Sequence, residues 1–136
     1  VDVSDEALKW SSIAVMKKAY KLYKERGYRT RLLTAAYRRE EHWSEFIGGD
    51  LIMTIPHVWQ VKINESDTEV ISRIDKPVSE NIMEELRKLP VFIEAYEEGA
   101  QTPADFDNYK LLHSVVKNFL AGYDKFVGIV REYFFI

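Results

Sequence analysis

The pattern of apolar and polar residues between positions 28 and 57 predicts a strand, a short helix and a second strand. Two apolar runs, residues 30–37 and 51–55, are each too short for a helix. Gly27 precedes the first run and a Gly-Gly pair precedes the second, and a helix commonly ends at glycine before the chain enters a strand. Neither run alternates apolar with polar residues. We therefore expect two parallel strands that are buried on both faces.

Most of the remaining chain has the periodicity of helices. Ser4, Ser79 and Thr102 are expected to cap three of them, because their side chains can accept hydrogen bonds from first-turn N–H groups. The polar segment 64–77 is expected to be a surface connection. The predicted helices are residues 5–26, 39–47, 56–63, 80–89, 91–97, a further helix start at residues 102–105, and one long helix from about residue 108 to the end.

The first predicted helix should pack on the sheet through one apolar stripe. This stripe has helical spacing, and it leaves the lysines of the helix on the opposite, solvated face. Its members are Leu8, Ser12, Val15, Ala19 and Leu22, widened by Met16 and Tyr23.

The last predicted helix has a near-heptad apolar stripe that needs a partner surface. We expect ordinary core packing for this stripe, and a cofactor wall and a partner-binding helix are the alternatives. The interior glycines Gly122 and Gly128 each cost up to about 1 kcal/mol against alanine, so we expect close packing beside them. The stripe consists of Leu112, Val115, Val116, Phe119, Leu120, Tyr123, Phe126, Val127, Val130, Tyr133 and Phe134.

The composition is that of a globular domain with its own core. The chain has 136 residues, of which 46% are hydrophobic and 30% are charged, and this length allows one domain. A complete eight-stranded α/β barrel needs about 250 residues and is therefore excluded. The absence of cysteine excludes disulfides and thiolate metal sites. No apolar run approaches the roughly 18 residues of a membrane span, so we expect no membrane partner and a cytoplasmic location.

The net charge of −3 conceals a strongly basic segment. Residues 17–39 contain nine lysines and arginines and one acid, Glu25, which is a local sum of nine minus one, or +8. Such a segment is typical of an anion site for phosphate or nucleic acid, or of a solvated helix face. The interleaved aromatic and basic residues of single-strand RNA binders are missing. We expect no nucleic-acid partner, and an RNA-binding domain is kept as an alternative.

Candidate chemistry gathers at the carboxyl ends of the two predicted strands, where parallel α/β sheets hold ligands. Tyr37 and Arg38 lie at the end of the first strand, and Thr54 and His57 lie at the end of the second. A basic residue beside the start of a helix suits a phosphate group, because first-turn N–H groups point toward the anion. His42 has no partner at a useful spacing. The three histidines are too widely spaced to suggest a metal site, and no cofactor motif occurs.

The chain resembles the carboxy-terminal part of bacterial transaldolases of the longer type. The resemblance covers most of the chain and is strongest over residues 13–59. Family members often carry the motif A-S-F-R at the end of strand seven of their barrel, and the sequence here is Ala35-Ala36-Tyr37-Arg38. The resemblance makes Arg38 the arginine that binds the substrate phosphate. Ala36 stands in place of the serine and offers only its backbone.

The fold class implied by the resemblance is α/β, a partial TIM (β/α)8 barrel that is helix-rich overall. Residues 1–63 are expected to form the last two βα units, with two parallel strands. Residues 78–136 are expected to form a helical C-terminal region that packs on the barrel within the same single domain. The Schiff-base lysine of the family lies on strand four and its acid/base carboxylates lie on strands one and three. No catalytic residue is therefore expected in this chain, whose first-helix lysines have the positions of exposed residues.

The intact protein is expected to transfer a dihydroxyacetone unit between sugar phosphates in the pentose phosphate pathway, through a lysine imine and without a cofactor. This chain is expected to be its C-terminal fragment, which contributes the substrate-phosphate site and is inactive alone. We expect the fragment to self-associate as a dimer, by pairing its open strand edges or by exchanging the long terminal helix. The main alternative is a non-catalytic, helix-rich interaction module.

Overall fold

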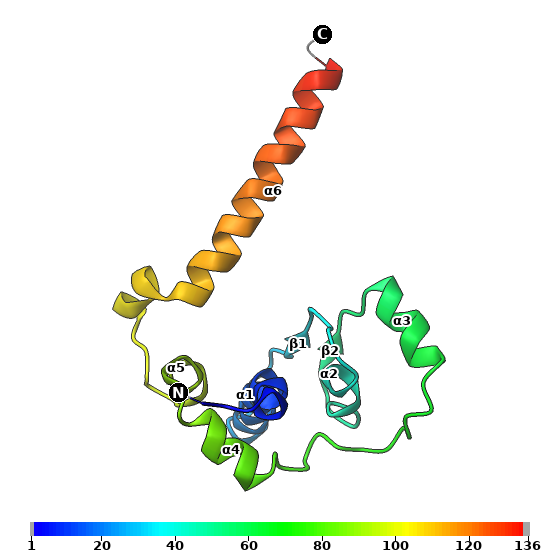
Figure 1. Cartoon of the computed structure of the whole chain (residues 1–136), viewed down its shortest axis with the longest axis vertical. Coiled ribbons are helices and arrows are strands. Elements are labelled where there is room, and N and C mark those ends of the chain that lie inside the picture. The colour runs from blue at the N-terminus through cyan, green and yellow to red at the C-terminus, as the bar shows by residue number, and fades with distance from the viewer. Residues whose placement is uncertain (1, 135–136) are drawn as a thin grey trace. The chain divides into compact units, whose positions relative to one another are not determined.

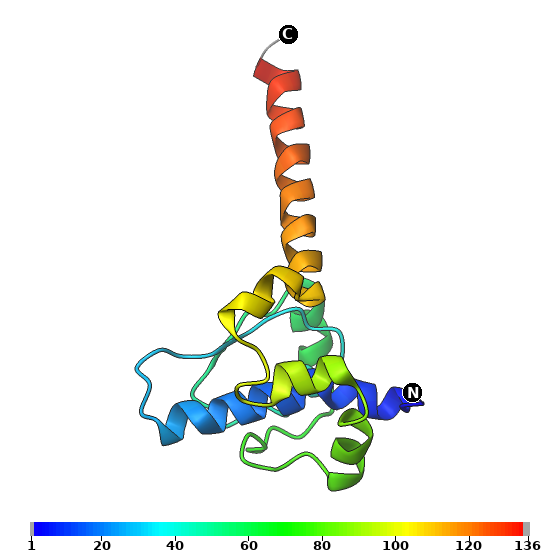
Figure 2. The ribbon, with the colours of Figure 1, turned by 90° about the vertical axis from the view of Figure 1, so that its left-hand side faces the viewer.

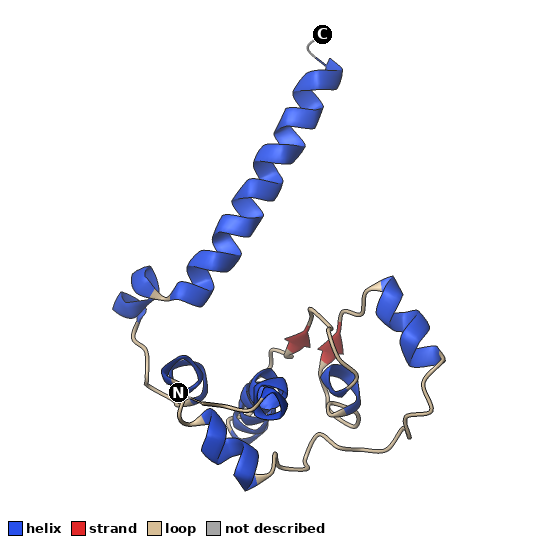
Figure 3. Cartoon of the chain, in the orientation of Figure 1, coloured by secondary structure: helices blue, strands red, loops and turns tan. Residues whose placement is uncertain are grey.

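The computed structural model describes residues 2–134 and divides the chain into two compact units, Val1–Glu97 and Glu98–Ile136. Within the described residues, the first unit contains five α-helices and two short strands (Figure 1), and the second contains a 3₁₀ helix and one long α-helix. Figure 3 shows that helices predominate and that the two strands lie side by side. The prediction of a helix-rich chain with two parallel strands is confirmed.

Helix α1, Asp5–Glu25, begins where the sequence predicts it. The Oγ atom of Ser4 accepts a hydrogen bond from the Ala7 N–H at 3.1 Å, and two acidic residues in the first turn suit the positive end of the helix dipole. The helix ends before Gly27, whose φ of 62° lies in the left-handed region that a residue without Cβ adopts readily.

The buried face of α1 differs from the predicted stripe, so that prediction is wrong. Leu8 is 43% exposed, whereas its neighbour Ala7 is completely buried. At about 100° of rotation per residue, the buried residues lie on the side of α1 nearly opposite the predicted stripe, although Val15 and Met16 of that stripe are partly buried. The residues that α1 buries are Ala7, Ile13, Ala14, Lys17 and Tyr20.

Lys17 accounts for the difference between the predicted and the observed face, because this lysine lies at the centre of the buried face. Its side chain is only 9% exposed, which also corrects the expectation that this lysine is solvated. The Nζ atom donates to Glu45 Oε2 at 2.6 Å, to the Arg73 carbonyl at 2.9 Å and to the Lys76 carbonyl at 2.7 Å. All three ammonium donors are thus satisfied, as burial of a charge requires.

Helices α4, Glu80–Leu86, and α5, Pro90–Tyr96, pack against α1. Figure 2, turned by 90° from Figure 1, shows both helices beside the blue α1 helix. Ser79 occupies the N-cap position of α4, as predicted, although its side chain makes no capping hydrogen bond. The core between these helices consists of Ala7, Ala14, Met83, Leu86 and Phe92.

Strands β1, Leu33–Thr34, and β2, Ile52–Met53, pair in parallel, with Leu33 opposite Ile52 and Thr34 opposite Met53. The expectation of burial on both faces is wrong, because Leu33 is 52% exposed and Ile52 is 45% exposed. Thr34, on the alternate face of β1, is buried. Only one face of the pair packs on the described part of the chain. The cluster beneath it consists of Ile13, Tyr20, Phe46, Leu51 and Ile74.

Of the two helices that follow the strands, α2 is shorter than predicted, and α3 has the predicted length but begins one residue later. Helix α2 spans Glu41–Ser44, and tight turns carry the chain from there to Gly49. Helix α3 spans His57–Asn64 with Pro56 at its N-cap, and none of its residues is buried. On its expected apolar side, Val58 is exposed, and Trp59 and Ile63 are only partly covered. The expected connection between α3 and α4 contains no regular element, but it contributes the buried Ile74 to the core.

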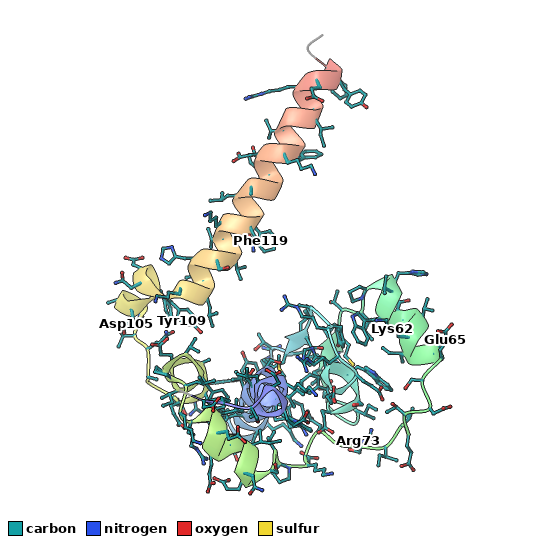
Figure 4. All side chains as sticks on the ribbon, viewed as in Figure 1. Lys62, Glu65, Arg73, Asp105, Tyr109 and Phe119 are labelled. Atoms are coloured by element: carbon teal, nitrogen blue, oxygen red, sulfur yellow. The ribbon has the colours of Figure 1, made fainter. Side chains whose placement is uncertain are left out.

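The second unit contains the 3₁₀ helix η1, Pro103–Asn108, and helix α6, Lys110–Phe134. Thr102 and Asp105 form the predicted capping box, in which the Thr102 N–H donates to Asp105 Oδ2 at 2.8 Å. No residue of α6 is buried, so the expected core packing of its apolar stripe is not found. Phe119, labelled in Figure 4, is 76% exposed. Residues 135 and 136 of the predicted helix lie outside the described residues.

Replacement of Lys17 by methionine is expected to lower the free energy of unfolding of the first unit by about 3 to 5 kcal/mol, because it leaves the Glu45 carboxylate buried without its partner. Urea titration followed by tryptophan fluorescence measures this change. The three tryptophans, Trp10, Trp43 and Trp59, all lie in the first unit and report on it alone.

Lys21→Met is the matched control, since Lys21 lies on the same helix and its ion pair with Glu25, at 3.8 Å, is exposed to solvent. We expect its cost to remain below about 0.5 kcal/mol. The double variant Lys17→Met with Glu45→Leu should be less unstable than Lys17→Met alone, because it removes the unpaired charge. Equal stabilities of the Lys17 and Lys21 variants would contradict the role given to the buried pair.

Candidate functional site

The carboxyl ends of β1 and β2 form one edge of the first unit. The Thr54 N–H donates to the Thr34 carbonyl at 2.9 Å, so the residues that follow the two strands leave the sheet side by side. Arg38 follows β1 through a short turn, and His57 begins α3 immediately after β2. The structure therefore brings the sequence-predicted residues to the same end of the strand pair.

Arg38 is exposed, as a ligand-binding cation must be. Within residues 2–134, no carboxylate lies within ion-pairing distance of its guanidinium group. Its backbone N–H donates to Nδ1 of His42 at 3.3 Å, which fixes the main chain at this residue. Arg38 thus combines an anchored backbone with a side chain that is available to an anion.

His42 has a structural contact that its sequence spacing did not reveal. Since Nδ1 accepts a hydrogen bond, the proton of the neutral ring is on Nε2. Burial lowers the pKa of His42 below its usual value, the positive charges of Arg39 and Arg38 lower it further, and Glu41 opposes the change. The lowered pKa favours the neutral ring that can accept from the main chain.

Tyr37 points into the protein and does not line the open strand ends. It is 5% exposed, and its hydroxyl lies 2.6 Å from Oγ1 of the equally buried Thr34 on β1. Burial raises the pKa of Tyr37, while the hydrogen bond with Thr34 acts in the opposite direction. The prediction that Tyr37 lines the site is therefore wrong, because its hydroxyl is committed to the strand. Thr34 was not predicted, since a single threonine in an apolar run carries no signal for such a contact.

Ala36 adopts a φ of 60°, the only positive φ of a non-glycine residue among those described. This left-handed conformation costs an alanine roughly 1 to 2 kcal/mol. Its side chain is exposed and carries no polar group. The residue can offer a ligand only its backbone, and its predicted place in a phosphate site stays a prediction.

Thr54 and His57 are both exposed beside the strand ends. The N–H groups of His57 and Val58 lead α3 and precede any intrahelical acceptor. By contrast, the Trp59 N–H already donates to the Pro56 carbonyl at 2.9 Å. Such leading N–H groups are the reason that helix amino termini suit anions. These two residues keep their predicted place, and their role stays a prediction. No group of three or more His, Asp or Glu side chains in residues 2–134 is arranged to hold a metal ion.

The basic segment is largely neutralised by ion pairs. Five of its nine cations have carboxylate partners, and three of these pairs are Lys17 with Glu45, Lys18 with Glu97 and Arg31 with Asp50. The remaining two pairs join Lys21 to Glu25 and Lys24 to Asp75. The high local charge therefore does not form one continuous cationic surface.

Two hollows in the first unit lie away from the strand ends. A groove of about 760 Å³ runs between α1 and the segment around Ile74–Val78, and a smaller one of about 310 Å³ lies near Tyr28 and Arg31. Neither is lined by Arg38, Thr54 or His57. We assign the candidate site to the strand ends on chemical grounds, because the cations that line the larger groove are mostly paired with acids.

Two parallel strands joined by a helix, with polar residues at their carboxyl ends, are the layout of an α/β ligand-binding protein. Residues 3–126 match the family model described as transaldolase/fructose-6-phosphate aldolase. The chain belongs to this family, and the predicted resemblance to transaldolases is confirmed. A search of curated proteins and a search of solved structures each gave no match. None of the helices in the described part of the chain is long and apolar enough to cross a membrane.

Proposed function

We propose that this chain supplies the substrate-phosphate site of a transaldolase-type enzyme, with Arg38 as the residue that binds the phosphate. The observation that carries the proposal is the exposed, unpaired Arg38 guanidinium at the carboxyl ends of two parallel strands. The family match supplies the chemical class, because aldolases and transaldolases of carbohydrate metabolism act on phosphorylated sugars. Thr54, His57 and the amino end of α3 complete the proposed site.

The proposed reaction of the intact enzyme is the transfer of a dihydroxyacetone unit between sugar phosphates through a lysine Schiff base. That chemistry needs an amine that loses its proton near neutral pH. Lys17, the one buried lysine in residues 2–134, has its Nζ atom committed to hydrogen bonds with a carboxylate and two carbonyls. We therefore propose that the catalytic lysine belongs to a part of the parent enzyme outside this chain.

The proposed fold of the parent is a TIM barrel of which this chain contributes the last two βα units. Three features support this proposal: the parallel pairing, the helical connection between the strands, and the exposure of Leu33 and Ile52. Each strand of a two-stranded sheet has one unpaired edge, and barrel closure is the arrangement that removes such edges.

Arg38→Ala is expected to weaken binding of inorganic phosphate to this chain by at least tenfold. The loss of a charge-assisted hydrogen bond costs about 1.5 to 3 kcal/mol, which corresponds to a factor of roughly 10 to 150. The measurement is a titration of the ¹⁵N-labelled chain with phosphate at low ionic strength, followed through the backbone amide signals near residue 38.

Arg29→Ala provides the matched control. Arg29 is exposed, lies before β1 at the opposite end of the strand, and has no ion-pair partner in the described residues. The same unit of charge is lost, so a general electrostatic effect predicts equal losses for the two variants. The proposed site predicts less than a twofold change for Arg29→Ala. Equal phosphate affinities of the wild-type chain and Arg38→Ala would refute the proposal.

Treatment of this chain with fructose 6-phosphate and sodium borohydride is expected to produce no adduct. Borohydride reduces a lysine imine to a stable amine, so a Schiff base formed on the chain would appear as an increase in intact mass. The described lysines are exposed or partly exposed, apart from Lys17, which is buried and held in an ion pair. An adduct at any lysine would show that this chain itself carries the imine-forming residue.

A second candidate function is self-association through α6, and the uncovered apolar face of this helix favours it. Eight residues follow a strict heptad, with spacings that alternate between three and four, and none of them is buried. The charged residues of α6 lie on the other side. A second copy of the chain supplies an identical stripe, and identical stripes pack knobs into holes in a two-fold dimer. The heptad positions are Tyr109, which immediately precedes α6, and Leu112, Val116, Phe119, Tyr123, Phe126, Val130 and Tyr133 within it.

Phe119→Lys is expected to convert a dimer of this chain into a monomer at tens of micromolar, because it places a charge at the centre of the heptad stripe. Ala121→Lys is the control, since residue 121 lies on the opposite face of the same helix and receives the same charge. Light scattering coupled to size-exclusion chromatography measures the mass. A monomeric wild-type chain, or a dimer in both variants, would rule out this interface.

A further inference from the structure

The turn between β1 and α2 contains a backbone conformation that its own sequence does not favour. Ala36 has a φ of 60°, whereas an L-residue with a side chain strongly prefers negative φ. Such a conformation persists only when the surrounding structure holds it. Because Ala36 is exposed and apolar, its own side chain provides no contact of this kind. The restraint must come from its neighbours.

The restraint on the carboxyl side of Ala36 is the Tyr37 side chain. The ring is buried, and the hydroxyl lies 2.6 Å from Thr34 Oγ1. Thr34 itself is held in the sheet, since it pairs with Met53 and its carbonyl accepts the Thr54 N–H. The hydrogen bond therefore ties the turn directly to the strand pair. Both partners are about 95% buried, so water does not compete for the contact.

A second restraint lies immediately after Tyr37. The Arg38 N–H donates to His42 Nδ1 at 3.3 Å, which joins the end of the turn to the first residues of α2. Arg38 is thus flanked by an anchored residue and has an anchored backbone, while its side chain extends from the surface. This combination suits a group that must present a charge in one place, because little conformational freedom is lost when the anion binds.

From this geometry we infer that the Thr34–Tyr37 hydrogen bond is a positioning device for Arg38, which holds the strained turn so that the guanidinium faces a phosphate group at the strand ends. The inference rests on the proposed function of Arg38 as the phosphate-binding residue. Tyr37 and Thr34 do not touch the ligand in this arrangement. They act through the main chain at residues 36–38, and Tyr37 is a positioning residue.

Tyr37→Phe tests the inference, because it keeps the buried ring and removes only the hydroxyl. We expect the dissociation constant of inorganic phosphate to rise about three- to tenfold, measured by the same ¹⁵N titration of the full chain. The titration observes the signals of folded molecules, so a variant that is merely less stable shows an unchanged dissociation constant. A positioning role raises the constant in the folded protein itself.

Two substitutions of Thr34 separate a hydrogen bond from packing. Thr34→Ser keeps the hydroxyl but loses the methyl group, and we expect phosphate affinity within twofold of the wild-type chain. Thr34→Val keeps the shape but loses the hydroxyl, and we expect the same loss as for Tyr37→Phe. The double variant Thr34→Val with Tyr37→Phe should be no weaker than either single variant, since both remove one shared interaction. Weaker binding by Thr34→Ser than by Thr34→Val would assign the contact to packing and overturn the inference.

The Arg38→Ala titration distinguishes failure of this inference from failure of the proposed function. If Arg38→Ala abolishes phosphate binding while Tyr37→Phe and Thr34→Val bind like the wild type, the phosphate site stands and the positioning role is overturned. If the wild-type chain binds phosphate no better than Arg38→Ala does, both the proposed function and the positioning role are refuted. If Tyr37→Phe weakens binding but Arg38→Ala does not, the tyrosine acts on something other than Arg38 and the inference is again overturned.

Discussion

The buried ammonium of Lys17 is the constraint on which the arrangement of the first unit depends. Removing a charge from water costs several kcal/mol, so each of its donors needs an acceptor. The acceptors come from the turn after α2 and from the connection before α4, two segments about 28 residues apart in the chain. One side chain on α1 therefore fixes the places of both. Ile74 lies between the two carbonyls in the sequence and enters the core beside Ile13, so the polar contact and the apolar packing require the same arrangement.

The segment that carries the candidate site is held between two buried polar contacts. At its start, the Tyr37 hydroxyl meets Thr34 on β1, and at its end the Glu45 carboxylate meets Lys17 on α1. The seven residues between these anchors include Arg38 and the whole of α2. A helix of four residues is too short to be stable by itself. Its order, and hence the placement of Arg38, must come from these tertiary contacts.

The sequence was sufficient for the order of the elements and for the end of the sheet at which the candidate site lies. Glycine, proline and capping residues marked the boundaries, and the spacing of the two apolar runs indicated parallel pairing. The same reasoning chose the wrong face of α1. Periodicity assigns a lysine to the solvent-exposed face, and the pattern of one helix carries no information about the distant acceptors of Lys17, which are Glu45 and two carbonyls. The sequence reasoning also placed Tyr37 in the site. The hydrogen bond between Tyr37 and Thr34 depends on the turn at residues 35–37, which the sequence pattern does not reveal. Burial of the strands was overestimated. A run of apolar residues indicates that a strand can be buried on both faces, but it does not show whether other elements of the chain cover both of those faces.

The departure of A-A-Y-R from the A-S-F-R motif has a physical consequence at the strand end. In the motif of the resembling family, the serine hydroxyl contributes to phosphate binding and the aromatic ring has no polar group. Here residue 36 has lost the hydroxyl, and the aromatic residue at position 37 has gained one that faces inward to Thr34. In the proposed site, a direct contact with the anion is thus replaced by a hydrogen bond within the turn. A proposed site with fewer groups for the phosphate depends more on how well Arg38 is placed before binding, because ordering costs are subtracted from a smaller number of contacts. The positive φ of Ala36 and the buried Tyr37–Thr34 hydrogen bond then belong to one proposed arrangement, in which the backbone at the strand end holds Arg38 in place.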